Sequence, residues 1–328
     1  MVRFASLDVG SNTVRLLVAE RLSSNRFRAL RVERIITRLG GGFSESGELN
    51  ESSMERTAEG VSTLADRSKK DGVSQVFAVG TGVLREAKNQ KDFLERVERC
   101  TGISLRLLSG REEANLMLQG VLWSLEDKTL PRLVADVGGW STEILWVEGE
   151  TPRETVSLRL GAVALTEGFI KADPPSVREL EELETHTRNL LRGIREQWES
   201  AGRTVQNLHP NLIGTAGTAT TLAAIDLGLT LYEQQKVNGH MISLRQTKDL
   251  YHRLRCLPVR ERQKIPGLET GREDLILAGT AVILNLLQVF NLTTLEVIDS
   301  GLLEGVLLEG MSQTRNDECG LRNEKAKG

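Results

Sequence analysis

The feature of this sequence that most constrains its fold is an internal duplication of a hairpin motif. Residues 5–19 read ASLDVGSNTVRLLVA, and residues 134–147 read VADVGGWSTEILWV. In both segments an apolar strand runs into Asp-x-Gly, a small polar turn follows, and a second apolar strand leaves. This pattern is typical of a β-hairpin with Gly, Ser or Thr at its tip.

A second pair of motifs follows in the same order. The first half contains QVFAVGTGVLREA around Gly80, and the second contains PNLIGTAGTATTLAA around Gly214. Each predicts a buried strand, a Gly-Thr turn and the start of a helix. Asp8 and Asp136 are 128 positions apart, and Gly80 and Gly214 are 134 positions apart. Because these two spacings are similar, the second half repeats the motif order of the first. We therefore predict an α/β fold made by tandem duplication, with the ligand in a cleft between the copies.

The length of 328 residues fits two domains of ordinary size. The motifs place the first domain at residues 1–121 and the second at 122–300, and residues 301–312 are expected to pack back on the first. The tail, residues 313–328, has almost no apolar periodicity, which predicts disorder. An apolar content of 39% and a charged content of 27% exclude a disordered or fibrous chain.

Charge and hydropathy exclude several classes of partner. A net charge of −3 argues against a broadly basic surface, so no nucleic acid is expected to bind. The longest apolar stretch, residues 275–290, is too short and too polar to span a bilayer, and the first residues lack a signal-peptide pattern. We expect a cytoplasmic protein without a membrane partner. Cys100, Cys256 and Cys319 lie far apart, which gives no support to a zinc site or a disulfide framework.

The polar tips of the two hairpins are candidate phosphate-binding loops. A tight turn rich in Gly, Ser and Thr directs backbone N–H groups and hydroxyls toward one point, as a phosphate requires. One such turn is more often only a turn, but two in register within a duplicated frame favour phosphate binding. The tip residues are Gly10, Ser11, Asn12 and Thr13 in the first half and Gly138, Gly139, Ser141 and Thr142 in the second.

Three carboxylates lie beside these tips. An acid next to a phosphate is repulsive unless a cation lies between them. Asp8, Asp136 and Glu143 are therefore interpreted as Mg²⁺ ligands, directly or through water, or as groups that orient water. The alternative for the two aspartates is that they cap the turns, which Asp often does.

Eight segments follow one another along the chain: LDVGSNTVRLLV, VGTGVLREA, LLSGREEANLMLQGV, VADVGGWSTEI, IGTAGTATTLAA, KVNGHMIS, GLETGREDLILAG and DSGLLEGVLLEG. In this order, from about residue 5 to residue 310, they resemble the motifs of the exopolyphosphatase/guanosine pentaphosphate phosphatase family. The resemblance implies two actin-like (ribonuclease H-like) domains, because the family belongs to the superfamily of actin, heat-shock chaperone ATPases and sugar kinases, and its shorter members contain only these domains.

The resemblance also implies roles for individual residues. Glu113, in SGREEA, matches the general base that activates the attacking water, whereas the residues alone would suggest that Glu112 and Glu113 form a solvated helix start. Arg85 matches an arginine near the phosphates, and Arg272 is a candidate for gripping the distal phosphate chain. Asp8, Asp136 and Glu143 match the acids of the two loops. The turn on the nucleotide side, or in the second domain, consists of Gly214, Thr215, Gly217 and Thr218.

Two positions depart from the family pattern. Trp140 stands in DVGGWSTE where the family commonly has a glycine, and Ala216 stands in GTAGT where it has GTGGT. The indole would narrow the cleft, stack on a guanine base, force a different backbone angle, or simply pack. The alanine at position 216 weakens the match of this turn to the family pattern only slightly.

The resemblance implies Mg²⁺-dependent exopolyphosphatase activity, in which water attacks the terminal phosphorus. The alternatives are hydrolysis of guanosine pentaphosphate, and binding of guanosine tetra- or pentaphosphate without turnover. A sugar or acetate kinase fits less well, because the base position in SGREEA suits hydrolysis. Polyphosphate or a guanosine polyphosphate is thus the expected ligand, and a homodimer is expected from the resemblance alone.

Overall fold

The computed structural model describes residues 2–23 and 26–325. The chain divides into two compact units. Unit 1 comprises the residues up to Trp123 and those from Gly301 onward, and unit 2 comprises Ser124–Ser300. The boundaries expected from the motifs, after residues 121 and 300, fall within two residues of this division.

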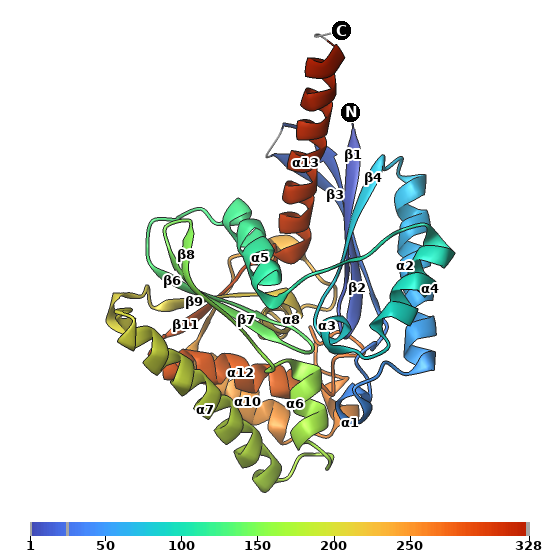
Figure 1. The fold of residues 1–328 in the computed structure, drawn as a ribbon. Coiled ribbons are helices and arrows are strands. Elements are labelled where there is room, and N and C mark those ends of the chain that lie inside the picture. Colours follow the sequence, from blue (N-terminus) through green and yellow to red (C-terminus); the bar gives the residue numbers. More distant parts are fainter. Residues whose placement is uncertain (1, 24–25, 326–328) are drawn as a thin grey trace. The chain divides into compact units, whose positions relative to one another are not determined.

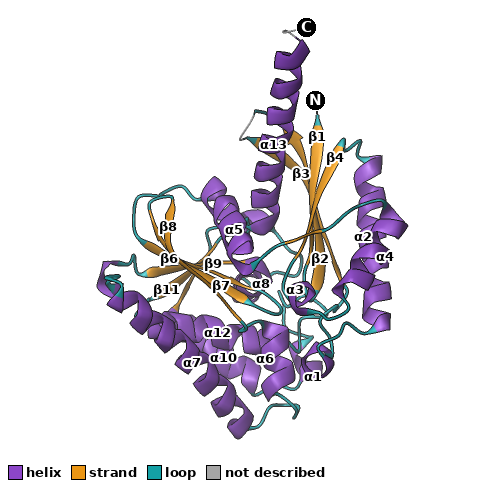
Figure 2. Ribbon diagram, viewed as in Figure 1, coloured by secondary structure: helices purple, strands orange, loops and turns teal. Residues whose placement is uncertain are grey.

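Unit 1 is a five-stranded mixed sheet with the order β3-β2-β1-β4-β5. Strand β1 is antiparallel to β2 and parallel to β4. Helices α2 and α4 lie on one side of the sheet and α13 on the other (Figure 1; Figure 2). The elements of unit 1 are β1 Arg3–Val9, β2 Thr13–Arg21, β3 Phe27–Ile36, α1 Phe43–Ser46, α2 Glu51–Lys70, β4 Gln75–Gly80, α3 Val83–Glu86, α4 Gln90–Thr101, β5 Arg106–Leu107, α5 Gly110–Ser124 and α13 Leu302–Lys325.

Helix α13 returns to unit 1, because its apolar face completes the core of that sheet. Leu303, Leu307 and Met311 are buried against side chains of β1 and β2. The backbones of α13 and α5 also lie in contact, because a Cβ on Gly305 would be only 1.8 Å from the carbonyl oxygen of Leu116. Residues 301–312 therefore pack on the first domain, as expected from the sequence.

Helix α13 extends to Lys325 and so runs into the tail, residues 313–328, for which the sequence predicted disorder. Residues 326–328 lie outside the described part of the chain. A helix that has been nucleated by packing adds each further residue at low cost, and Gln, Arg, Glu and Lys are good helix formers. The lack of apolar periodicity shows that this segment has no apolar face to bury, not that it cannot be helical.

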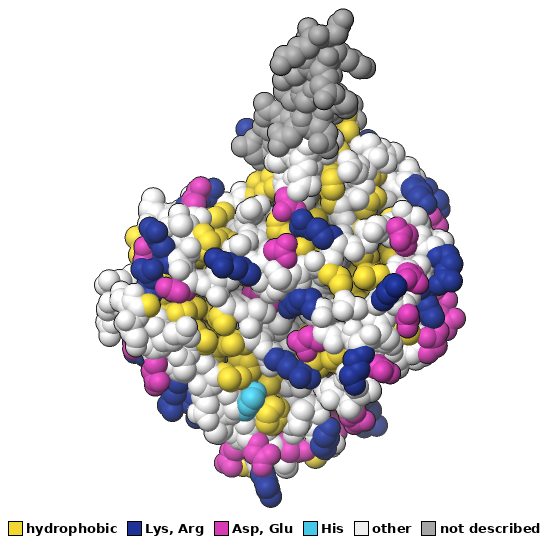
Figure 3. All heavy atoms as spheres, in the orientation of Figure 1, with side chains coloured by type: hydrophobic (Ala, Val, Ile, Leu, Met, Phe, Trp, Pro, Cys, Tyr) yellow, Lys and Arg dark blue, Asp and Glu magenta, His cyan; other side chains and the backbone are white. Residues whose placement is uncertain are grey.

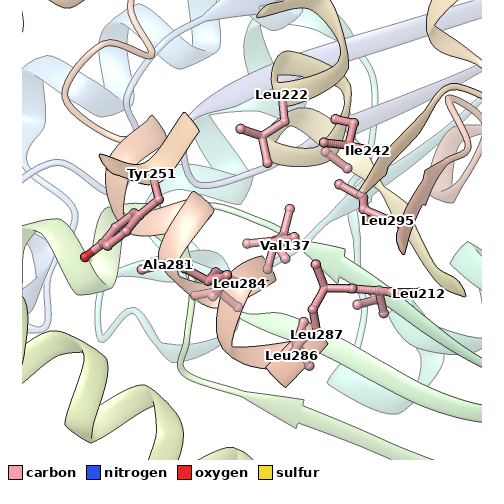
Figure 4. Packing of buried hydrophobic residues seen from close by; sticks show 14 of the residues in the cluster. Val137, Leu212, Leu222, Ile242, Tyr251, Ala281, Leu284, Leu286, Leu287 and Leu295 are labelled. Atoms are coloured by element: carbon pink, nitrogen blue, oxygen red, sulfur yellow. The ribbon is translucent and has the colours of Figure 1, made fainter. Parts of the chain in front are cut away.

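Unit 2 is a six-stranded mixed sheet with the order β10-β11-β9-β6-β7-β8. Helices α8 and α12 pack on the sheet, and α7 and α10 pack on α12. Figure 4 shows the resulting core, in which leucines of α12 meet Val137, Leu212 and Leu295 of three neighbouring strands. The elements are β6 Arg132–Val137, β7 Thr142–Glu148, β8 Thr151–Leu158, α6 Ala162–Phe169, α7 Val177–Ser200, η1 Val205–Asn207, β9 Asn211–Thr215, α8 Ala216–Asp226, α9 Gln234–Val237, β10 Met241–Ser243, α10 Leu244–Arg255, α11 Val259–Arg262, α12 Ile276–Val289 and β11 Thr294–Val297.

The strand orders confirm the predicted duplication. The order β3-β2-β1-β4-β5 of unit 1 recurs in unit 2 as β8-β7-β6-β9-β11, with β10 added at the edge. The packing repeats as well. A Cβ on Gly80 would lie 2.9 Å from Leu107 of the next strand, and a Cβ on Gly214 would lie 2.5 Å from Leu295 of the next strand. Each glycine therefore leaves room for a leucine at the same place in its sheet.

The surface carries both signs of charge. On the face shown in Figure 3, Lys and Arg side chains are interspersed with Asp and Glu, which agrees with the small net charge of −3. In the described part of the chain, no helix is both long and apolar enough to cross a lipid bilayer.

Candidate active site

The tip of the β1–β2 hairpin is held by neighbouring backbone. The N–H of Gly10 donates to the carbonyl of Thr13 (3.0 Å) and closes the turn. The carbonyl of Ser11 accepts from the N–H of Gly40 (2.7 Å), and its hydroxyl accepts from the N–H of Val83 at the start of α3 (3.0 Å). Ser11, Asn12 and Thr13 are buried. This first tip is thus a fixed, polar loop.

Asp8, just before this tip, is ion-paired with Arg15 across the hairpin. The guanidinium donates to one carboxylate oxygen of Asp8 from two nitrogens, at 2.6 and 3.0 Å. The hydroxyl of Thr81 lies 3.3 Å from the other oxygen. Asp8 is buried, with an exposed fraction of 2%. One oxygen of Asp8 is therefore committed to a cationic side chain of its own unit.

Glu113 and Arg85 form a second ion pair in unit 1. Arg85 also donates to the carbonyl of Leu108 (3.2 Å), directly before α5. The side chain of Glu113 is only 10% exposed. The structure thus places two predicted site residues, from α3 and from the first turn of α5, in direct contact.

The neighbouring acid, Glu112, has a different task. Its carboxylate accepts from the backbone N–H (2.8 Å) and the hydroxyl (2.6 Å) of Ser109, and the Glu112 N–H donates back to that hydroxyl (3.2 Å). This reciprocal arrangement caps the start of α5. The hydrogen bonds from the Ser109 side chain and backbone lower the pKa of Glu112, which is exposed. The sequence alone treated the two acids alike; the structure turns one toward solvent and buries the other.

In unit 2 the tip of the β6–β7 hairpin repeats the closure seen in unit 1. The N–H of Gly138 donates to the carbonyl of Ser141 (3.0 Å). The start of α6 then binds the tip: the N–H groups of Ala162 and Val163 donate to the carbonyls of Gly138 and Gly139, at 2.9 and 2.7 Å. These two hydrogen bonds hold the backbone of the tip against the first turn of α6.

A row of polar residues crosses the sheet at the base of this tip. Asp136 of β6 pairs in register with Glu143 of β7, which pairs with Ser157 of β8. Residues directly opposite one another in a sheet project from the same face. The Ser157 hydroxyl donates to Glu143 (2.7 Å), and a Cβ on Gly138 would lie 3.9 Å from a carboxylate oxygen of Asp136. Two carboxylates thus stand side by side directly below the tip.

The equivalent positions of the two units carry opposite charges. Arg15 follows Asp8 by seven positions, and Glu143 follows Asp136 by seven. Both pairs face each other across their hairpins. The duplicated position therefore supplies a cation in unit 1 and a second anion in unit 2.

The acid pair of unit 2 consists of the residue types that could hold a magnesium ion. Within the described residues, no group of three or more His, Cys, Asp and Glu side chains could enclose a metal. Mg²⁺ is commonly held by one or two carboxylates together with waters and substrate phosphates, rather than by a cage of protein ligands. Asp136 and Glu143, opposite each other on one face, offer the oxygens that such a site needs.

Three predicted hydroxyl ligands are used for structure instead. Each of these hydroxyls donates to a backbone carbonyl. Thr142 donates to the carbonyl of Leu160 (2.8 Å). Thr215 donates to the carbonyl of Ser300 (2.9 Å), and Thr218 donates to the carbonyl of Val137 (3.0 Å). A threonine hydroxyl has one proton to donate. Any donation from these residues to a phosphate must therefore come from their backbone N–H groups.

Trp140 is a packing residue in this structure. Its exposed fraction is 1%, and the guanidinium carbon of Arg159 lies 4.2 Å from the ring centroid. The N–H of Gly161 donates to its carbonyl (3.0 Å). Among described residues other than glycine, a positive φ occurs at Arg38, Ala216 and Asn291. The tryptophan therefore fits the backbone of the tip, and the altered backbone angle considered from the sequence does not occur.

The second departure from the family pattern, Ala216, has a strained backbone conformation. Ala216, at the first position of α8, has a φ of 61°. This left-handed conformation costs a residue with a Cβ roughly 1–2 kcal/mol, whereas glycine adopts it freely. The substitution of the family's glycine by alanine is thus accommodated, but at the expense of backbone strain.

We expect Ala216→Gly to raise the free energy of unfolding by about 0.5–1 kcal/mol, because relief of strain exceeds the added entropy of the unfolded chain. Ala219→Gly, in the same helix but without a positive φ, is the control; because Ala219 is buried in the core, the change should lower the free energy of unfolding by about 1–2 kcal/mol. Denaturant titration of both variants measures the difference. If both substitutions destabilise alike, the left-handed backbone at Ala216 is not strained.

Arg272 lies against the turn that begins α8. A Cβ on Gly217 would fall 2.2 Å from a guanidinium nitrogen of Arg272, so only glycine allows this approach. The Nε of Arg272 donates to Glu269 (2.8 Å). The structure therefore brings together two elements that the sequence predicted separately, the Gly214–Thr218 turn and Arg272.

Two site residues were missed from the sequence, Arg15 and Ser157. Arg15 has a usable signal, because it stands at the same spacing from Asp8 as Glu143 does from Asp136. Ser157 has none, since it is brought beside Glu143 only by the pairing of β7 with β8.

Comparison with known proteins identifies similar chains. A family model described as the Ppx/GppA phosphatase family matches residues 17–314. A guanosine-5'-triphosphate,3'-diphosphate pyrophosphatase from Vibrio vulnificus is 28% identical over 319 residues, which are 97% of this chain and 61% of the relative. An exopolyphosphatase 2 from Mycobacterium tuberculosis is 28% identical over 321 residues, 94% of this chain and 98% of the relative. The chain thus spans about three fifths of the Vibrio protein and nearly all of the Mycobacterium protein.

Solved structures of similar proteins share the fold. A Ppx/GppA family member from Aquifex aeolicus superposes with a TM-score of 0.77 at 32% identity, covering 95% of this chain and 98% of its own. An exopolyphosphatase from Cytophaga hutchinsonii superposes with a TM-score of 0.85 at 25% identity, covering 94% and 98%. The two units therefore have the duplicated α/β fold that the motifs predicted and the actin-like fold that the resemblance implied.

Proposed function

Because the chain belongs to the Ppx/GppA phosphatase family, we propose that it is a Mg²⁺-dependent exopolyphosphatase that removes the terminal phosphate of inorganic polyphosphate. The observation that carries the proposal is the separation of the two acids in SGREEA. Glu112 is an exposed helix cap, whereas Glu113 is buried and paired with Arg85. A carboxylate held in this way, beside a residue suited to phosphate, has the placement of a general base rather than of a solubilising surface group.

In the proposed reaction, the oxygen of a water molecule bonds to the terminal phosphorus while the bridging P–O bond breaks. Glu113 accepts the proton that the water loses, the shortened polyphosphate chain departs with the bridging oxygen, and the attacked phosphorus is released as orthophosphate. Among the residues of this chain, the backbone N–H groups of each hairpin tip and the guanidinium groups of Arg85 and Arg272 are suited to stabilising charge on phosphate oxygens. Arg85 also orients Glu113, with which it is in contact.

Asp136 and Glu143 would hold the magnesium ion, and Ser157 would orient Glu143 through its hydrogen bond. When bound, Mg²⁺ supplies positive charge that neutralises phosphate oxygens. Asp8 is not assigned to the ion, since one of its oxygens already accepts two hydrogen bonds from Arg15. Its role in this proposal is to hold Arg15 at the base of the first tip.

Hydrolysis of guanosine pentaphosphate is the second candidate, and it requires the same groups. It is favoured by the Vibrio relative, which is named as a guanosine-5'-triphosphate,3'-diphosphate pyrophosphatase and is as similar in sequence as the Mycobacterium exopolyphosphatase. Binding of the nucleotide without turnover is less well supported, because Glu113, Asp136 and Glu143 are all present. Release of orthophosphate from each substrate by the purified protein distinguishes these functions.

The magnesium assignment predicts a specific defect for Glu143→Gln and Asp136→Asn. Each should raise the Mg²⁺ concentration that gives half-maximal activity, by about tenfold or more, since a neutral amide is a poorer ligand than a carboxylate. Glu148→Gln, at the other end of the same strand, is the control and should leave the Mg²⁺ requirement unchanged. Activity that persists in excess chelator would remove the metal from the mechanism.

A further inference from the structure

The segment that carries Arg272 is anchored by a buried arginine, Arg262, which no motif identified. Arg262 ends the short helix α11, and its exposed fraction is 2%. Within residues 2–23 and 26–325, its guanidinium forms no ion pair with a carboxylate. Its Nε donates to the carbonyl of Leu254 near the end of α10 (2.9 Å), and one terminal nitrogen donates to the carbonyl of Glu273 (3.2 Å). Arg262 therefore joins two separate stretches of backbone, one of which is adjacent to Arg272.

Neighbouring contacts hold the same turn. The carboxylate of Glu273 accepts from the side chain of Gln263 (2.9 Å) and from the N–H of Gly271 (2.5 Å), which has a φ of 90°. The N–H of Arg272 donates to the carbonyl of Glu269 (3.1 Å). The backbone on both sides of Arg272 is thus tied down, which limits where its side chain can point.

Stability alone is a weak reason for this arrangement. Burial lowers the pKa of Arg262, an effect that the charges of Asp173 and Asp274 oppose. The remaining terminal nitrogen of Arg262 is buried and makes no hydrogen bond to the described part of the chain. A buried guanidinium with an unused donor costs free energy that an apolar side chain would not. What it provides is a rigid, planar link between two carbonyls.

Arg262 holds the backbone next to Arg272, and Arg272 contacts the turn at the start of α8 that is proposed to bind ligand. Arg272 lies against Gly217, at the first turn of α8, so a small shift of the 269–275 segment would move its guanidinium away from that turn. We propose that Arg262 is a positioning residue, which sets the placement of Arg272 for phosphate binding without touching the substrate itself. This inference rests on the role of Arg272 in the proposed function.

A double-mutant cycle with polyphosphate tests the inference. Arg262→Lys keeps the charge but cannot reach both carbonyls with a planar fork. It should raise KM on the order of tenfold and change kcat less than about twofold, because it misplaces a binding group. In an Arg272→Ala background the same substitution should change KM by less than about twofold. Arg260→Lys, on the same helix with a side chain 86% exposed, is the matched control and should be neutral in both backgrounds.

An equal loss of kcat/KM in both backgrounds would overturn the inference, since it would mean that Arg262 supports the fold and not Arg272 in particular. An unchanged KM in Arg262→Lys would overturn it as well. Hydrogen exchange provides a readout that does not need activity: amides of residues 269–275 should exchange faster in Arg262→Lys than in Arg260→Lys, while those of β6 and β9 stay protected. Unchanged exchange contradicts the anchoring. If instead the exchange changes as expected but the unsubstituted protein releases no phosphate, the proposed function has failed and the anchoring has not.

Discussion

Glu113→Gln is expected to lower kcat by on the order of 10²–10⁴ with little change in ligand affinity. The amide is nearly isosteric with the carboxylate but cannot accept a proton from water. Its neighbours remain in place, because Arg85 also donates to the carbonyl of Leu108 and so stays at the start of α5. Initial rates of phosphate release at saturating substrate, together with a direct binding titration, separate the two quantities.

Glu112→Gln is the matched control for this experiment. Glutamine can still accept hydrogen bonds from Ser109 as the third residue of a capping box, so helix α5 should keep its cap. We expect kcat to change by less than about twofold. Near-normal turnover in Glu113→Gln, or an equal loss in both variants, would refute the assignment of Glu113 as the base.

Trp140→Ala is expected to lower the free energy of unfolding by about 3–5 kcal/mol, as is usual when a large buried aromatic side chain is truncated. The indole is 1% exposed and its backbone is held by Gly161. Because the loss acts through folding, turnover of polyphosphate and of guanosine pentaphosphate should fall by similar factors. Denaturant titration and the two assays measure these effects.

Arg159→Met is the comparison variant for the loss of stability in Trp140→Ala. Arg159 is exposed and its guanidinium lies over the Trp140 ring, so its removal should cost only about 0.5–1 kcal/mol. If the Trp140 variant is as stable as the original protein but gains activity on long polyphosphate alone, the indole narrows the substrate path. If it weakens only guanosine pentaphosphate, the indole stacks on the base.

The duplication was the part of the fold that the sequence predicted best, because both of its signals are local. An Asp-x-Gly between two apolar runs specifies a hairpin, and a Gly-Thr after a buried strand specifies a strand-to-helix turn. Each hairpin and each turn lies where expected, at Asp8, Gly80, Asp136 and Gly214.

Features that depend on tertiary contacts could not be predicted from the sequence. Asp8 and Asp136 look alike in the sequence, yet their cross-strand partners, Arg15 and Glu143, give them different surroundings. Thr142, Thr215 and Thr218 looked like phosphate ligands, but their hydroxyls donate to backbone carbonyls of distant segments. A hydroxyl's partner is set by the fold and leaves no trace in the local pattern.

Backbone strain was likewise hidden. Trp140 was the more conspicuous departure from the family pattern, because an indole is large. The structure places the left-handed backbone at Ala216 instead. Side-chain size is visible in a sequence, whereas the φ angle that makes glycine preferable is not, unless a turn type specifies it.

The most direct test of the account is phosphate release from medium-chain polyphosphate and from guanosine pentaphosphate, measured side by side with Mg²⁺ and with excess chelator. The account predicts that the purified protein releases orthophosphate from polyphosphate and that chelation abolishes the release. No release from polyphosphate in the presence of Mg²⁺ would contradict it, and release from guanosine pentaphosphate alone would support the second candidate function instead.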